Sequence, residues 1–405
     1  MRIAQVAPPW ISIPPQQDGG TETIIYHLVE ALHARGHEVT LFAPADAYTS
    51  ARQVSFIPRS LINEGVPWQA NLKAYYHLHK SLEYIAQHDF DIVHTHLSSS
   101  GDMYIFPLTA ELTIPHITTL HSRFPFDRAT NHWTGDADDY FMEWAQSVPL
   151  VTISESARAQ VNPQTCIAGT VHYGVPITGT LTKDGGSREP DTYSSYSLPA
   201  MPDIYHQHNL YGNYFVWIGH FTYEQGAHLA IEAARSCHVP LWLIGIKESA
   251  NLEAMHYYQH MVAPFIDNQQ IRSGIPATRE QKLKLLRQAR GLLNPMAYAE
   301  PSGFALLEAM SVGCPVISFA NGAAAEIITD GKNGFLTHTL QEMTNSMTRI
   351  TSINRLEVRE HIKRHFSTEV MTENYLHLYR KVVDSYTLSQ VARPLQHSRL
   401  LLTEG

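Results

Sequence analysis

The stretch NPMAYAEPSGFALLEAMSVGCP, residues 294–315, joins a polar turn to an apolar helical run. Ser302 is a plausible N-cap, and Phe304–Met310 has the composition of a helix. Glu300 then stands ahead of the helix and Glu308 on it. Backbone N–H groups at the helix start suit a ligand that carries an anionic group and several hydroxyls. Two ordinary carboxylates on a solvated surface helix are the alternative, and this stretch alone leaves both interpretations open.

The length and composition of the chain set its class. The 405 residues are too many for one compact core, so two domains are expected. The formal charge of −9 argues against a nucleic-acid partner. The 24 histidines show none of the spacings typical of metal sites, so no metal is predicted.

Cysteine usage and hydropathy bear on location. Cys166, Cys237 and Cys314 are far apart and odd in number, which favours a reducing, cytoplasmic setting over a disulfide framework. The first ten residues contain no apolar run typical of a signal peptide. No stretch of roughly 18 to 20 apolar residues occurs, so no transmembrane segment is expected. Peripheral membrane contact and the oligomeric state stay open.

The first residues read as a strand–loop–helix–strand unit. Arg2–Ala7 is an apolar strand, Thr21–Arg35 has an apolar stripe at helical spacing, and Glu38–Phe42 is the next strand. Gly19 and Gly20, between strand and helix, would allow close approach of a ligand to the backbone. A flexible loop tip is the simpler alternative for this pair.

Three further strands each end in polar residues. They are Asp91–His96, Pro115–His121 and Leu150–Ser154. Ligands bind at the carboxyl ends of strands in open parallel sheets, so these ends are candidate site positions. His121 is favoured because Arg123, two residues on, could face an anion. A structural role is the alternative for any single histidine here.

The amino-acid composition changes in the middle of the chain. Residues 178–212 are rich in Gly, Ser, Thr, Pro, Asp and Tyr and lack periodicity, as expected of a linker with an irregular insert. We therefore predict an N-terminal domain at 1–177 and a C-terminal domain at 213–369. The second domain is predicted to contain strands at 214–218, 240–244, 291–295, 315–319 and 334–336 and helices at 224–236, 247–262, 279–290 and 323–329. The chain from Leu340 on is predicted to be helical. The class is α/β, with two Rossmann-like halves and a ligand cleft expected between them.

Several short blocks occur together in an order that resembles the family 4 retaining glycosyltransferases. Glu300 to Glu308 resembles the E-x7-E signature of that family. The supporting blocks are Gly19–Glu22, DIVHTH at 91–96, Thr119–His121, Thr152–Glu155, Gly174–Val175, Gly313–Val316, Asn321–Ile328 and Gly331–Leu336. The resemblance covers roughly residues 1 to 177 and 212 to 385. It implies the GT-B fold, in which C-terminal helices, here a helix at about 370–388, return to the N-terminal domain.

The resemblance also implies roles for the residues of the opening stretch. Glu300 corresponds to the carboxylate that holds the hydroxyls of the donor sugar, and Glu308 to the one that binds the nucleotide ribose. The N–H groups of Phe304 and Ala305, with Ser302 and Gly303 beside them, would face the distal phosphate. Ser302 stands where the family often has Phe.

In the N-terminal half, Gly19 and Gly20 resemble the loop that approaches the donor phosphates. His121 resembles the histidine near the reacting centre, and Arg123 is the nearby cation. Together with Glu300, His121 is predicted to be catalytic.

One segment departs from the family pattern. The family usually has Gly-Arg at the end of the first strand of the second domain, with Lys-Gly a few residues on. Here Gly219 is followed by His220, and Gln225 precedes Gly226. Permanent cations at a leaving diphosphate are each worth on the order of 10²-fold in rate, and neither His nor Gln is equivalent. Three explanations are open. Arg123 or Lys247 supplies the missing charge, the donor is unusual or turnover is slow, or catalysis has been lost.

The sequence thus predicts a retaining hexosyltransferase that moves a sugar from a nucleotide-diphosphate donor, with UDP or GDP favoured, to a hydroxyl acceptor. A carbohydrate, a lipid-linked sugar and a small molecule are all open as the acceptor. Neither a metal nor another cofactor is implied. The main alternative is a non-catalytic or weakly active sugar- or nucleotide-binding protein with the same fold. A phosphorylase or epimerase is a third reading.

Overall fold

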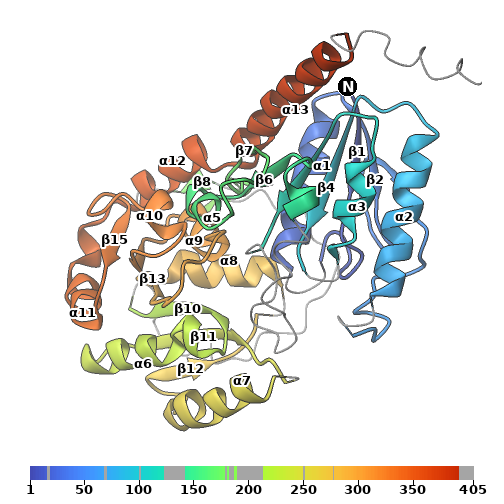
Figure 1. Cartoon of the computed structure of the whole chain (residues 1–405). Helices are drawn as coiled ribbons and strands as arrows, with labels where there is room; N and C mark the ends of the chain where they lie inside the picture. Colours follow the sequence, from blue (N-terminus) through green and yellow to red (C-terminus); the bar gives the residue numbers. More distant parts are fainter. Residues whose placement is uncertain are drawn as a thin grey trace, which may run out of the picture. The chain divides into compact units, whose positions relative to one another are not determined.

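The computed structural model describes residues 1–15, 19–67, 71–99, 102–122, 142–177, 180–181, 187–188, 213–249, 251–276 and 278–391. These residues form two compact units, each built on its own sheet (Figure 1). Unit 1 comprises residues 1–153, 160–171 and 371–405, and unit 2 comprises residues 154–159 and 172–370. The predicted Arg123 and most of the 178–212 segment lie outside the described residues.

Unit 1 contains a seven-stranded sheet in the order β3-β2-β1-β4-β5-β6-β7, parallel throughout. Its strands are β1 (Arg2–Val6), β2 (Glu38–Phe42), β3 (Arg52–Val54), β4 (Ile92–Leu97), β5 (His116–Leu120), β6 (Leu150–Thr152) and β7 (Ile167–Thr170). Its helices include α1 (Gly20–Ala34), α2 (Leu72–Ala86) and α3 (Ile105–Ala110). Buried apolar side chains from α2, α3 and the central strands form the core on one face, among them Leu78, Val93 and Phe106.

Unit 2 repeats the plan with six parallel strands in the order β12-β11-β10-β13-β14-β15. The strands are β10 (Phe215–His220), β11 (Leu241–Ile246), β12 (Ile271–Ser273), β13 (Gly291–Asn294), β14 (Val316–Phe319) and β15 (Gly334–Thr337). The helices are α5 (Glu155–Ala159), α6 (Ala227–Ser236), α7 (Leu252–Tyr257), α8 (Arg279–Gln288), α9 (Phe304–Ser311), α10 (Ala324–Ile327), α11 (Leu340–Arg349) and α12 (Arg355–His365). A short antiparallel pair, β8 (Thr180–Leu181) and β9 (Ser187–Arg188), accompanies them.

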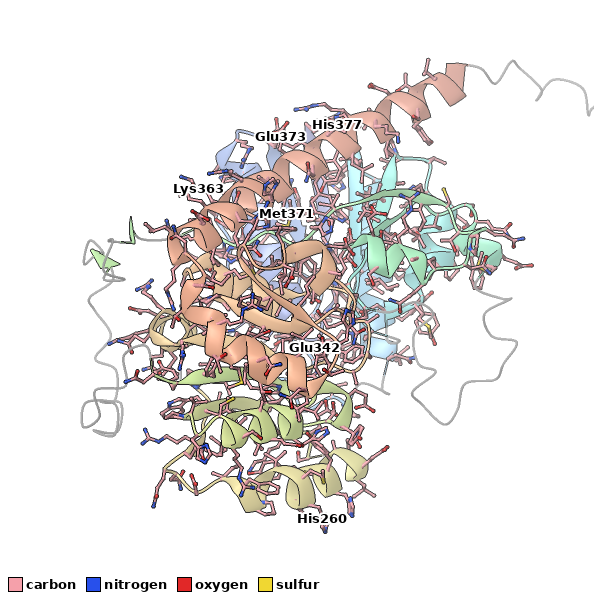
Figure 2. The ribbon with its side chains drawn as sticks, turned by 90° about the vertical axis from the view of Figure 1, so that its left-hand side faces the viewer. His260, Glu342, Lys363, Met371, Glu373 and His377 are labelled. Atoms are coloured by element: carbon pink, nitrogen blue, oxygen red, sulfur yellow. The ribbon has the colours of Figure 1, made fainter. Side chains whose placement is uncertain are left out.

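The last helix, α13 (Thr368–Val391), carries the chain from unit 2 into unit 1. Its apolar and tyrosine positions recur at helical spacing: Met371, Tyr375 and Tyr379 are buried. Glu373 and His377 are exposed and project from the outer side of the helix (Figure 2). The helix predicted at about 370–388 lies within this element.

Most predicted elements of the second half are present, and the largest difference is at the predicted helix 247–262. Asn251 accepts hydrogen bonds from the N–H groups of Glu253 and Ala254, so it caps α7 and the helix starts at Leu252. The helix then widens into one π turn at Tyr258–Val262. Sequence periodicity also missed the three-residue strands β3 and β12, which are too short to show alternation.

Gly226, at the start of α6, lies very close to the backbone at the end of β13. Its φ of 73° is left-handed, and a Cβ there would lie 2.3 Å from the carbonyl oxygen of Pro295. Gly331 has a φ of 72° with no atom within 4 Å of the added Cβ, which makes it a matched control. We expect Gly331→Ala to lower the free energy of unfolding by roughly 1 kcal/mol and Gly226→Ala by about 3 kcal/mol or more, because only the latter adds a backbone clash. Urea unfolding followed by tryptophan fluorescence measures both. Equal losses would contradict the close approach.

Candidate functional site

The order of the strands in unit 2 identifies where a ligand site is expected. Strand order reverses between β10 and β13, whose neighbours β11 and β14 continue in opposite directions across the sheet. Crevices at the carboxyl ends of strands at such a switch point are the usual ligand sites of parallel α/β sheets. β10 ends at His220, the loop after it carries Gln225, and the loop after β13 carries Glu300. The Ala297 N–H donates to the Glu224 carbonyl at 2.8 Å. The structure thus brings together the two loops that the sequence singled out.

Glu300 lies in the loop between β13 and α9, as predicted, and its carboxylate turns toward that loop. Oε1 accepts a hydrogen bond from the Ser302 N–H at 3.0 Å and another from the Ser302 hydroxyl. Oε2 accepts the Gly303 N–H. The half-buried carboxylate therefore has one edge fixed by the protein, and its remaining lone pairs can accept hydrogen bonds from hydroxyl groups.

The start of α9 differs from the prediction in one respect. Gly303, in the left-handed region at φ 61°, is the N-cap residue, whereas Ser302 was expected there. The Ser302 hydroxyl still accepts the Phe304 N–H at 3.3 Å from one position earlier. Because the Ser302 and Gly303 N–H groups bind Glu300, an anion at this terminus would meet the Ala305 N–H and would compete with the Ser302 hydroxyl for the Phe304 N–H.

A second loop supports the backbone of Glu300. The Ala323 N–H donates to the Glu300 carbonyl at 2.9 Å. Gly322 has a φ of 59°, and a Cβ there would lie 2.2 Å from the Glu300 carbonyl oxygen. Asn321 donates from its side-chain amide to the Met296 carbonyl at 2.8 Å, which adds a second attachment between the two loops. The Asn321–Gly322 motif is thus part of the scaffold that positions Glu300.

Glu308 lies on α9, as predicted, and its side chain is only 2% exposed. Two cations of α8 bind it: Arg279 Nε lies 3.1 Å from Oε1, and Lys282 Nζ lies 2.6 Å from Oε2. Sequence reasoning missed both, although their three-residue spacing on an expected helix placed them on one face. A carboxylate buried at this depth requires such compensation. Each oxygen retains a second lone pair for a ligand hydroxyl.

The loop after β10 shows how the two departures from the family pattern are accommodated. Gln225 Oε1 accepts the His220 N–H at 2.7 Å, and a Cβ at Gly219 would lie 2.1 Å from that oxygen. Gly219 is therefore needed for the amide of Gln225 to lie against the strand end. His220 Nδ1 pairs with Glu248 Oε1 at 3.0 Å, and the hydrogen bond from His220 lowers the pKa of Glu248.

The two cations proposed as substitutes are only partly accounted for. Lys247 follows β11, and its Nζ lies 4.2 Å from the centroid of the Tyr258 ring, so it makes a cation–π contact within unit 2. Arg123 lies outside the described residues.

In unit 1, Gly19 and Gly20 begin α1, as expected for the loop after β1. A Cβ at Gly19 would lie 2.7 Å from the Cβ of Pro15 and 3.1 Å from Glu22 Oε2, so the turn is too close-packed for a larger residue. The Thr23 hydroxyl donates to the Gly19 carbonyl at 2.7 Å and fixes the first turn.

His121 follows β5 and is 5% exposed. Its Nε2 lies 2.9 Å from Nδ1 of His96, which is in turn 2.8 Å from Gln5 through Nε2. Burial lowers the pKa of His121 to about 3, so the imidazole is neutral at physiological pH. A neutral ring is suited to hydrogen bonding and not to pairing with an anion.

Asp102, which the sequence did not indicate, braces the loop after the adjacent strand β4. One oxygen accepts the Trp10 indole N–H at 2.7 Å, and the other accepts the N–H groups of Ser98 and Ser99. The carboxyl is fully buried, and burial raises its pKa despite these bonds. It fixes the strand-end loop next to β5.

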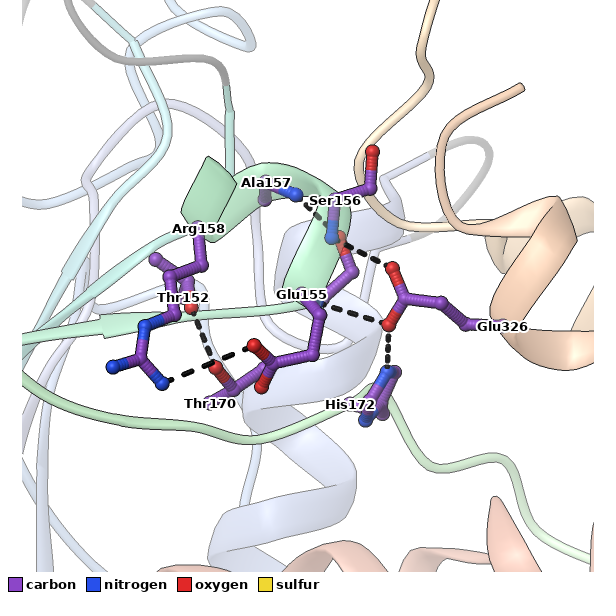
Figure 3. Close-up of polar contacts among 9 residues, drawn as sticks. Thr152, Glu155, Ser156, Ala157, Arg158, Thr170, His172 and Glu326 are labelled. Carbon is purple, nitrogen blue, oxygen red and sulfur yellow. Dashed lines mark hydrogen bonds and ion pairs between the residues drawn. The ribbon is translucent and has the colours of Figure 1, made fainter. Parts of the chain in front are cut away.

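A third carboxylate, Glu326 on α10, binds residues more than 150 positions away within unit 2 (Figure 3). It accepts the N–H groups of Glu155 at 2.9 Å and Ser156 at 2.7 Å, and it pairs with His172 Nε2 at 2.6 Å. Burial acts to raise the pKa of Glu326, but the three hydrogen bonds outweigh it and the net pKa is lowered. Glu326 thus attaches α5 and the 172–177 segment to the second sheet's helices.

In the part of the chain that the structure describes, no group of three or more His, Cys, Asp or Glu side chains is placed to hold a metal ion. No helix among the described residues is long and apolar enough to cross a membrane.

Comparison with known proteins places this geometry in a family. The profile described as Glycosyltransferase Family 4 matches residues 18–169, and that described as Glycosyl transferases group 1 matches residues 205–365. A 95-residue segment is 34% identical to a probable sucrose-phosphate synthase of Thermosipho melanesiensis. That match covers 23% of this chain and 22% of the relative, so it spans about a fifth of the relative's length.

Solved structures resemble nearly the whole chain. A sucrose-phosphate synthase from Thermosynechococcus elongatus has a TM-score of 0.67 at 16% identity and covers 95% of this chain and 100% of its own. Anabaena HepE, solved with UDP and glucose, has a TM-score of 0.61 at 17% identity and covers 93% of this chain and 98% of its own. At these identities the likeness establishes the fold, which is GT-B. With the two profiles, it shows that the chain belongs to the family 4-like GT-B glycosyltransferases.

The lowered pKa of Glu326 has a measurable consequence. A carboxylate whose pKa is lower in the folded than in the unfolded state stabilises the fold above its ordinary pKa of 4.5 and loses that effect as pH falls through the lowered value. We expect Glu326→Gln to lower the free energy of unfolding by roughly 2 kcal/mol at pH 7. The difference from wild type should shrink as the pH falls below 4.5.

Urea unfolding over a series of pH values checks this expectation. Glu342→Gln is the control, because exposed Glu342 also accepts one backbone N–H, from His338 at 2.7 Å. A Glu326→Gln loss that is the same at pH 3 and pH 7 would refute the charge-dependent contribution.

Proposed function

We propose that the protein is a retaining glycosyltransferase that moves a sugar from a nucleotide-diphosphate donor to a hydroxyl group of an acceptor. The observation that carries the proposal is the switch-point site of unit 2, where a half-buried and a buried carboxylate flank a helix start. Glu300 accepts hydrogen bonds from the donor sugar's hydroxyls, and Glu308 from the ribose. The N–H groups of Phe304 and Ala305 bind the distal phosphate.

UDP is the favoured nucleotide, followed by GDP. The Anabaena relative was solved with UDP, with UDP and glucose, and with UDP-glucose, which supports a uridine donor for this fold. The proposed site contains no metal and no other cofactor, because helix-terminal N–H groups take over charge stabilisation. In unit 1, Gly19 and Gly20 are the proposed donor-binding residues, and His121 is the second proposed catalytic residue. The protein acts in the cytoplasm.

The reaction proceeds on one face of the donor sugar. The acceptor oxygen forms a bond to the anomeric carbon as the bond from that carbon to the leaving phosphate oxygen breaks. The leaving diphosphate oxygen takes the acceptor's proton, so configuration is retained without an enzyme nucleophile. The protein contributes by orienting both substrates and by stabilising charge on the diphosphate.

The loop after β10 favours a second candidate, a donor-binding protein with weak or no transfer activity. Gln225 Oε1 accepts the His220 N–H, and His220 pairs with Glu248. An incoming diphosphate would have to compete with Glu248 for the imidazole. Catalysis in this site therefore depends more on the start of α9 than it does where Arg and Lys occupy these two positions.

Nucleotide binding is the first test of the proposal. Isothermal titration with UDP, GDP, ADP and TDP should show binding of at least one nucleotide, with UDP or GDP tightest. Glu308→Gln should weaken that binding by roughly 10-fold or more, because a charged acceptor of the ribose hydroxyls is lost. Glu342→Gln should leave it unchanged. Binding of none of the four nucleotides by wild type would sink the proposal.

Sugar transfer or release from the bound donor separates the two candidates. Anomer-resolved NMR of the products should show retention, and Glu300→Ala should lower the rate by about 10²-fold or more. The double variant His220→Arg/Gln225→Lys, which restores two permanent cations, should raise the rate by at least about 10-fold. Donor binding without release in wild type, together with no gain in the double variant, would favour the non-catalytic candidate.

A further inference from the structure

Two histidines lie one turn apart on the outer side of the α7 segment. His256 is in α7, and His260 is in the π turn that continues it. Both residues are exposed, and His260 projects outward from the ribbon (Figure 2). Their ring centroids are 4.1 Å apart, and the ring planes are inclined by 30°. The helix therefore presents two neighbouring imidazoles to solvent.

The ring of His260 is held in one tautomer. Its Nδ1 lies 2.9 Å from the carbonyl oxygen of His256, which can only accept a hydrogen bond. The proton of the neutral ring is therefore on Nδ1, and Nε2 carries the lone pair that a metal ion needs. A hydrogen bond from the second ring nitrogen to a backbone carbonyl is a usual support of a metal-binding histidine.

The spacing of the pair matches that of a metal-binding helix. In the HExxH motif, two histidines at i and i+4 bind Zn²⁺ from one face of a helix. Residues 256–260 read HYYQH, so the histidine spacing is the same and Tyr257 replaces the glutamate. Nitrogen atoms that share one Zn²⁺ lie about 3.3 Å apart, for tetrahedral geometry and Zn–N distances of about 2.0–2.1 Å. Rings with centroids 4.1 Å apart reach this spacing through small side-chain rotations.

A second pair with the same spacing is arranged differently. His361 and His365 lie on α12, with ring centroids 4.9 Å apart. His361 is half-buried, and its Nε2 lies 3.1 Å from the Ile327 carbonyl oxygen. That nitrogen therefore carries the proton of the neutral ring and is directed at the backbone. The spacing alone is thus not what distinguishes the α7 pair.

The charges around the two pairs also differ. Residues 252–262 include the carboxylate of Glu253 and no Lys or Arg. Lys247 contacts the Tyr258 ring, but Tyr258 is two residues from each histidine of the pair and so lies on another face of the helix. Lys363 and Arg364, in contrast, stand between the histidines of α12. A divalent cation is therefore less opposed at the α7 pair than at the α12 pair.

We propose that His256 and His260 form a chelate site for one divalent transition-metal ion, with Zn²⁺, Ni²⁺ and Cu²⁺ as the ions that fit. Imidazole nitrogen is a preferred ligand of all three. His260 binds through Nε2, and the exposed ring of His256 turns to the same ion. Water molecules complete the coordination, because two side chains are fewer than the four ligands of a structural zinc site. The site lies outside the proposed donor site and does not depend on the proposed function.

Isothermal titration of the full-length protein without a histidine tag tests the site, with Zn²⁺ as the probe. Wild type should bind one Zn²⁺ per chain at its tightest site. His256→Gln and His260→Gln should each weaken this binding by roughly 10²-fold, because a single nitrogen has no chelate advantage. The double variant should bind no more weakly than either single variant. His365→Gln, at the exposed position of the α12 pair, should keep the wild-type affinity.

Three outcomes of these titrations would overturn the proposal. They are a wild-type affinity no tighter than that of the double variant, an unchanged affinity in both single variants, and losses that add in the double variant. If His260→Gln does not fold, His256→Gln and His365→Gln decide the question. Light scattering should give the same mass with and without Zn²⁺. A mass that doubles with Zn²⁺ in wild type and not in His256→Gln would show an ion shared between two chains, which also overturns the chelate.

Urea unfolding gives a second measurement, which depends on the helix being folded. An ion that binds the folded chain in preference to the unfolded chain raises the unfolding midpoint. Zn²⁺ should raise the midpoint of wild type and of His365→Gln, and should leave that of His256→Gln unchanged. Cu²⁺ at the same concentration should raise the wild-type midpoint further. Equal Zn²⁺ shifts in wild type and His256→Gln would place the ion elsewhere and overturn the proposal.

Discussion

Parallel strands impose the constraint on which both units depend. In a parallel sheet the loops that follow the strands all emerge at one edge, and a reversal of strand order separates two neighbouring loops enough to admit a ligand. The reversal falls between β1 and β4 in unit 1 and between β10 and β13 in unit 2. Gln225 and Glu300 follow the two strands at the reversal in unit 2, and Gly19 follows β1 in unit 1. Within unit 2, the topology therefore brings candidate residues that are far apart in sequence to neighbouring loops.

Within that framework, carboxylates do most of the local organisation. Glu300 accepts hydrogen bonds from N–H groups of its own turn, and Glu308 forms ion pairs with Arg279 and Lys282 of α8. Glu326 gathers two N–H groups and an imidazole. Each of them is partly or wholly buried, so each requires several donors. The chain has a net charge of −9. These three of its acidic side chains lie where a carboxylate orders the backbone around it.

The sequence predicted what depends on short-range patterns. The helix of Glu308, the loop of Glu300 and the alternation of strands and helices follow from local spacing and turn residues, and the structure has them. The partners of those residues depend on contacts distant in sequence. Nothing near Glu326 indicates Glu155 or His172, and nothing near Gln5 indicates its partner Tyr379. The sequence also did not predict that the Gln225 side chain packs against Gly219 and accepts the His220 N–H. A glutamine after a strand is equally suited to face a ligand. The mistaken N-cap at Ser302 has a local cause: Gly303 can adopt a left-handed φ that serves the same purpose.

The attachment formed by Glu326 has a consequence for dissecting the protein into its parts. Unit 2 is not a continuous piece of chain, since residues 154–159 belong to it while the strands on either side of them belong to unit 1. A fragment that starts at residue 172 or later would leave the carboxylate of Glu326 without the N–H groups of Glu155 and Ser156. Exchange of whole halves between homologous enzymes would therefore have to move this short helix together with the C-terminal half. The part that would have to be exchanged therefore includes more than the second sheet and its helices, and it is not continuous in sequence.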